Sequence, residues 1–148
     1  MSNSYAARNK SELGHLRKVA EGLTDKQVAC PAGGPSWTVG GILGHLAFWD
    51  QRAIVLLRRW KAGGVGTSAI DIDAVNDAMR PILNALPSKT VMRLAIDSAE
   101  GIDKEIDSLD DGMLAKVETD GKPVRLDRAA HRIHHLEQIE KALRQENL

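Results

Sequence analysis

Apolar residues recur at helical spacing through most of this sequence and outline four long helices. They are expected over residues 4–22, 38–61, 87–109 and 126–144, where apolar positions return every three to four residues. That period is typical of a helix with one buried face. No segment shows the two-residue alternation of a half-buried strand. The pattern predicts an all-α antiparallel four-helix bundle, with residues 1–148 forming one domain.

The second of these helices has an unusual beginning. The preceding loop, Pro31–Pro35, is rich in proline and glycine, and Thr38 is expected to be the N-cap. Three glycines follow within the first two turns: Gly40, Gly41 and Gly44. Each lowers helix propensity by about 1 kcal/mol. Their presence predicts that a neighbouring segment approaches this helix closely.

Two connections are expected to carry structure of their own. A shorter helix over residues 72–86 lengthens the crossover between the second and third long helices. Asp71 or Asp73 is expected to open it, and Pro81 to break it.

The second such connection lies between the last two long helices. The run Thr119–Pro123 has Asp-Gly at its centre, which is typical of a turn. Val117 and Val124 beside it are expected to form a small hairpin, too short to define a sheet.

Charge and composition exclude some classes of function. The chain has 20 Lys and Arg against 20 Asp and Glu, and aromatic residues make up 3%. No basic surface is therefore expected for nucleic acid or an anionic membrane. The apolar stretch 42–57 is interrupted by charged residues, which indicates a core helix rather than a membrane span. The first twenty residues lack a signal-peptide core, and Cys30 has no partner for an intrachain disulfide, so a reducing cytoplasm is expected.

Three histidines give the strongest indication of chemistry. His131 and His135 are four residues apart in an expected helix, so their side chains point the same way and lie about 6 Å from each other. His134 falls on the opposite, charged side of that helix. His45, on the second long helix, also lies at the edge of an apolar face. Together, His45, His131 and His135 predict a three-nitrogen metal site with open coordination positions.

Each histidine also has an ordinary interpretation. A single pair at this spacing is a weak indication of a metal site, and His45 alone fits a histidine at the core edge bonded to backbone. The combination favours the metal site, because His134 is excluded by the same geometry. His15 lies on another helix and has no partner nearby in the sequence.

Other residues are weaker candidates for the site. Asp127 precedes His131 by four residues and fits a second-shell acceptor or an acid at a helix N-terminus. Gln138 fits a residue that orients a ligand, or a hydrogen bond at the bundle edge. Trp37 and Trp49 fit the lining of an apolar pocket or ordinary core packing. No general base is evident, since Asp50 lies off the face that carries His45.

Two motifs and one shorter segment resemble the DinB/YfiT-like superfamily, and they span nearly the whole chain. The stretch Pro35–Asp50 resembles the family's second-helix motif, and His131–Ile139 resembles its last-helix motif, His-x-x-x-His followed by Gln-Ile. Asp73–Asn76 resembles a segment of some members, including relatives of the ClbS/DfsB branch. The resemblance implies a four-helix bundle that binds a divalent metal ion, zinc or nickel. Its ligands would be His45, His131 and His135.

The resemblance also implies a class of reaction. The superfamily includes S-transferases and isomerases that use bacillithiol, mycothiol or glutathione, so a thiol-dependent reaction on a small electrophile is expected. A metal-dependent hydrolase is the second interpretation. The third is a ligand-binding or stress-related bundle without catalysis. The family also favours a homodimer.

Overall fold

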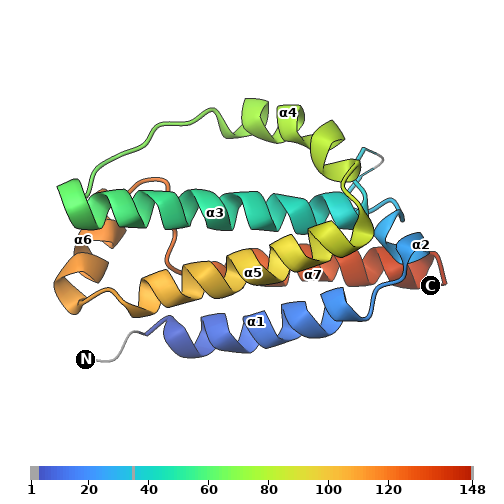
Figure 1. The fold of residues 1–148 in the computed structure, drawn as a ribbon, viewed down its shortest axis with the longest axis horizontal. Helices are drawn as coiled ribbons and strands as arrows, with labels where there is room; N and C mark the ends of the chain where they lie inside the picture. The colour runs from blue at the N-terminus through green and yellow to red at the C-terminus, as the bar shows by residue number, and fades with distance from the viewer. Residues whose placement is uncertain (1–3, 35, 148) are drawn as a thin grey trace.

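The computed structural model describes residues 4–34 and 36–147, which form an all-α bundle (Figure 1). Pro35, the first residue of the second-helix motif, lies outside the described residues. The helices in chain order are α1 (Ala6–Glu21), α2 (Asp25–Val28), α3 (Val39–Gly63), α4 (Ile72–Asn84), α5 (Ser88–Asp107), α6 (Asp111–Asp120) and α7 (Arg128–Gln145). The predicted all-α bundle is confirmed. The four long helices are α1, α3, α5 and α7.

The long helices pack in a ring in which α1 and α3 each contact both α5 and α7. In Figure 1, α4 lies along the outer side of α3 and carries the chain back to the end at which α3 began. As a result α3 and α5 run in the same direction, whereas α1 and α7 run opposite to them. The neighbouring pairs α3–α5 and α1–α7 are therefore parallel, and the expected antiparallel arrangement holds only for α1–α5 and α3–α7. The predicted short helix in the crossover is therefore present, and it covers the face of α3 that lies away from α1.

Side-chain caps explain where several helices begin. An oxygen of the N-cap residue accepts a hydrogen bond from a backbone N–H of the first turn in five helices of the described chain: Thr24 from Gln27, Thr38 from Gly41, Asp71 from Ala74, Asp110 from Met113 and Asp127 from Ala130. Such caps stabilise a helix by about 1 kcal/mol each. The predictions that Thr38 caps the second long helix and that an aspartate opens the crossover helix are confirmed.

Helix α4 does not break at Pro81 as expected. Pro81 lies inside the helix, which continues to Asn84. The missing N–H deprives the carbonyl of Asp77 of its helical donor, but Asp77 is exposed and its carbonyl can bind water instead.

The expected hairpin around residues 115–125 is also wrong. These residues begin in α6, and no strand occurs in the described part of the chain. Asp110 caps α6, and Gly121 ends it, so the Asp-Gly pair closes a helix instead of turning a hairpin. Val117 and Val124 lie in the core around Trp60.

The glycines of α3 allow the close approach that was predicted. A Cβ on Gly40 would lie 2.6 Å from Cγ1 of Val28, and one on Gly44 would lie 2.9 Å from Cδ2 of Leu83. Such separations are too short for real side chains. The glycines therefore let α2 and the end of α4 pack directly on the first turns of α3, next to His45.

The core consists of two apolar clusters along the bundle. The cluster near the start of α3 includes Leu43, Leu46 and Leu136, and the cluster at its other end includes Leu57, Trp60 and Ile106. Within the described residues, no helix combines the length and the apolar character needed to cross a membrane.

Candidate metal centre

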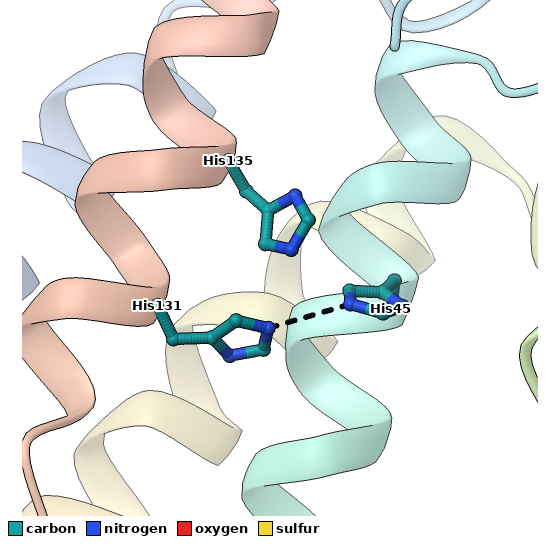
Figure 2. A group of neighbouring side chains, drawn as sticks. All are labelled: His45, His131 and His135. Atoms are coloured by element: carbon teal, nitrogen blue, oxygen red, sulfur yellow. Dashed lines mark hydrogen bonds between the residues drawn. The ribbon is translucent and has the colours of Figure 1, made fainter. Parts of the chain in front are cut away.

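Figure 2 shows three imidazoles pointing toward one another between α3 and α7. His45 comes from α3, and His131 and His135 come from successive turns of α7. One ring nitrogen from each residue lies within 4.8 Å of the other two. The Nε2 atoms of His45 and His131 are 3.3 Å apart. The structure thus brings together the three histidines that the sequence selected.

The spacing of these nitrogens suits one metal ion. Two imidazole ligands of a tetrahedral zinc, each at about 2.0–2.1 Å, are about 3.3 Å apart. The separation between His45 and His131 equals that value. Nδ1 of His45 is buried and makes no hydrogen bond to any residue that the structure describes, although the Asn76 side chain lies close to the ring. The donor set and its geometry therefore fit a divalent metal.

His135 is oriented by its neighbour on α7. Its Nδ1 lies 2.7 Å from Oε1 of Gln138. An amide oxygen only accepts hydrogen bonds, so Nδ1 carries the hydrogen and Nε2 keeps its lone pair. A metal-binding histidine is commonly held in this way by an acceptor on its second nitrogen.

Burial keeps the imidazoles neutral. Desolvation, followed by the charge of His135, lowers the pKa of His45 to about 4. Desolvation, followed by the guanidinium of Arg128, lowers the pKa of His131 to about 2. Burial also lowers the pKa of His135. A neutral imidazole has the free lone pair that a metal requires, so the three rings are ready to bind one at neutral pH.

Two pockets adjoin the histidine cluster. We call them the Arg52 pocket, of about 410 Å³, and the Arg80 pocket, of about 460 Å³. His45 borders both, whereas His131 borders only the first and His135 only the second. Each pocket is large enough for a small molecule. The cluster therefore borders two pockets.

The weaker candidates divide between these pockets. Trp49 and Asp127 border the Arg52 pocket, and Trp37 and Gln138 border the Arg80 pocket. Asp127 is the N-cap of α7 and also accepts a hydrogen bond from Arg8, as expected for an acid at a helix N-terminus. Its second-shell role stays a prediction.

The sequence interpretation missed two buried ion pairs beside the cluster. Arg128 donates Nε and Nη2 to Oδ1 of Asp50, at 2.9 and 2.7 Å. One turn further along α7, Arg132 donates to both oxygens of Asp103 on α5, at 2.7 and 3.0 Å. Apolar periodicity gives no sign of such pairs, because each needs a carboxylate on another helix. They fix α7, and with it His131, against α3 and α5.

Three further residues at the site were not singled out as site residues. His134 is exposed, as predicted, but it borders the Arg52 pocket, and its ring centroid is 4.8 Å from that of His135. Asn76 of α4 accepts a hydrogen bond from Nε1 of Trp49 at 3.0 Å and borders both pockets. Arg52 lies over the ring of Trp49, with 5.8 Å between the guanidinium carbon and the ring centroid. The Asp73–Asn76 resemblance was the one sequence signal for Asn76.

Comparison with known proteins identifies the family. A family model described as the DinB superfamily matches residues 11–139, which include all three histidines. Searches of curated proteins and of solved structures each found no match.

Proposed function

The chain belongs to the DinB superfamily, and we propose that it is a divalent-metal enzyme, most simply a thiol-dependent S-transferase or isomerase of a small electrophile. His45, His131 and His135 would hold the ion, zinc or nickel. The observation that carries the proposal is the cluster of three imidazole nitrogens within 4.8 Å of one another. A bound ion of this kind lowers the pKa of a coordinated thiol and so supplies a nucleophile at neutral pH.

The surroundings of the cluster favour an anionic nucleophile. Arg128 lies close enough to His131 to lower the pKa of that histidine. A fixed positive charge also stabilises a thiolate or another anion at the same place. Asp50 accepts two hydrogen bonds from Arg128 and holds the guanidinium in position.

Two pockets beside one cluster favour a transfer reaction between two molecules. A hydrolase needs one pocket and water, whereas a transferase must hold a thiol and an electrophile together. His45 borders both the Arg52 pocket and the Arg80 pocket. We therefore favour a transferase over a hydrolase. The buried Cys30 has no cysteine partner in this chain, which suits a reducing cytoplasm.

The first test is the metal content of the purified, untagged protein by elemental mass spectrometry. We expect about one zinc or nickel ion per chain, lost in His131→Ala and kept in His134→Ala. The second variant is a matched control, since His134 is an exposed histidine on the same helix. The metal site is refuted if the wild type holds no metal after reconstitution, or if the metal content of the two variants is the same.

The second test separates the kinds of activity. The metal-loaded protein is assayed with low-molecular-weight thiols and a chloronitroaromatic electrophile, and with an aryl ester in the absence of thiol. Thiol-dependent turnover that His131→Ala abolishes supports the transferase. Ester hydrolysis without thiol identifies the hydrolase instead. Metal binding without any turnover, with loss of stability in His131→Ala, indicates a structural metal in a ligand-binding bundle.

A further inference from the structure

Arg52 differs from the other arginines of the described chain that are buried or half-buried. Arg17, Arg80, Arg128 and Arg132 each pair with a carboxylate. Arg52 is half-buried and has no acidic partner among the described residues. Removing a guanidinium from water without a counter-charge is unfavourable. An unpaired cation in such a place indicates that an anion from outside the chain can occupy it.

The position of Arg52 is fixed by its neighbours. Its Nη2 donates to the backbone oxygen of Ser68 at 2.8 Å and to Oγ of Ser68 at 3.0 Å. Its guanidinium carbon lies 5.8 Å from the centroid of the Trp49 ring, which is a cation–π contact. None of these contacts uses Nε or Nη1. A carboxylate or a sulfonate can therefore bind Arg52 without displacing a protein group.

Arg52 borders the same pocket as His45 and His131. The wall of this pocket also contains apolar groups, Trp49, Ile72 and Val124, and a second cation, the exposed Arg125. The one acid in the wall, Asp127, already binds Arg8. Arg52 and Arg125, which have no carboxylate partner among the described residues, thus face a space with apolar sides.

We propose that the Arg52 pocket binds a small organic anion, whose carboxylate, phosphate or sulfonate pairs with Arg52 while its apolar part lies against Trp49 and Val124. The idea that this anion is the electrophilic substrate rests on the proposed function. The binding itself does not, because it requires Arg52 and no metal ion. The Arg80 pocket, which contains Asp73, Asp77 and Arg80, remains for the second reactant.

The test uses two dyes that differ by one charged group. The anion 8-anilinonaphthalene-1-sulfonate and its neutral parent, N-phenyl-1-naphthylamine, are titrated by fluorescence into the full chain after dialysis against EDTA. Removal of metal ensures that the sulfonate is not bound by an ion at the histidines. We expect the wild type to bind the anion more tightly than the neutral dye.

Substitutions assign the preference to one residue. Arg52→Gln should weaken binding of the anion about tenfold or more, the loss expected for a charge-assisted hydrogen bond, and leave binding of the neutral dye unchanged. Arg59→Gln removes the same charge from an exposed site on α3 and should change neither affinity. Arg52→Lys should retain part of the preference for the anion, and it serves as the test if Arg52→Gln fails to fold.

The results that would overturn the proposal are equally definite. Equal affinity of the wild type for the two dyes excludes an anion subsite, and so does an equal loss in the Arg52 and Arg59 variants. If the protein binds no metal but shows the Arg52-dependent preference, the anion subsite is supported and the metal enzyme is refuted. If it binds metal but lacks the preference, the metal site is supported and the anion subsite is refuted.

Discussion

Gly41→Ala tests how α4 is held over the first turns of α3. A Cβ on Gly41 would lie 2.0 Å from Oδ1 of Asn84, the last residue of α4, and 3.1 Å from Cε3 of Trp37. The Asn84 side chain must therefore move. That side chain accepts hydrogen bonds from N and Oγ1 of Thr38, at 3.2 and 3.1 Å, and donates to the carbonyl of Ser36 at 2.7 Å.

The expected loss of stability follows from these contacts. Three hydrogen bonds at about 1 kcal/mol each are broken, while alanine regains about 1 kcal/mol of helix propensity over glycine. Gly41→Ala should therefore lower the free energy of unfolding by about 2 kcal/mol. Gly14→Ala is the matched control, since Gly14 lies inside α1 and a Cβ there would meet nothing within 4 Å. That variant should gain about 1 kcal/mol.

Urea unfolding followed by circular dichroism measures both variants. A Gly41→Ala protein as stable as the wild type would refute the steric argument. A double-mutant cycle checks the cause as well as the size of the effect. In an Asn84→Ala background the oxygen that clashes is absent, so Gly41→Ala should there be neutral or stabilising. A full loss in that background would show that Asn84 is not responsible.

Three further predictions concern the charged groups of the centre. Arg132→Met should lower the free energy of unfolding in urea by about 3–5 kcal/mol, because Asp103 stays buried without its partner. Adding Asp103→Leu to this variant should restore most of that loss. An equal loss in the single and the double variant would contradict this. The pKa of His45 is about 4 and that of His131 about 2 when folded, against about 6.5 unfolded. Below pH 6.5 the unfolded chain therefore binds protons that the folded one does not, and the metal-free protein should lose up to about 1.4 kcal/mol per pH unit for each imidazole. In metal-free His131→Gln, the free energy of unfolding should fall less steeply than in the wild type as the pH drops from 7 to 5. An equally steep fall would refute the lowered pKa of His131. Zinc at about a hundred times its dissociation constant should stabilise the wild type by about 2.7 kcal/mol and leave His131→Ala unaffected, as measured by thermal unfolding.

Periodicity and caps were enough to predict the long helices, because these features act locally. The same holds for the histidines. Their four-residue step on α7 and the edge position of His45 are properties of single helices, and the bundle needs only to bring the two edges together. The glycines of α3 were informative for a similar reason, since three poor helix formers in two turns require a packing explanation.

The features that were missed depend on partners far away in the sequence. Arg128 and Arg132 are buried only because Asp50 and Asp103 on other helices neutralise them. A helical wheel of α7 by itself would place a charged guanidinium on the solvent-exposed side of the helix. The Asp-Gly turn signal was misassigned because its residues are equally suited to end a helix, and the apolar contacts of α6 with Trp60 decide between the two. The relation to the ClbS/DfsB branch and the homodimer stay predictions.

Polar groups join α3 to α7 at two successive levels of the bundle. His45 meets His131 across a sequence separation of 86 residues, and Asp50 meets Arg128 across 78. The segment between each pair contains α4, α5 and α6. An ion held by His45 and His131 would act as a reversible crosslink that closes this long loop, and in a chain-entropy picture the benefit of a crosslink grows with loop length. Detachment of α7 would then require release of the ion, so the concentration of available metal would determine how susceptible this helix is to proteolysis through local unfolding.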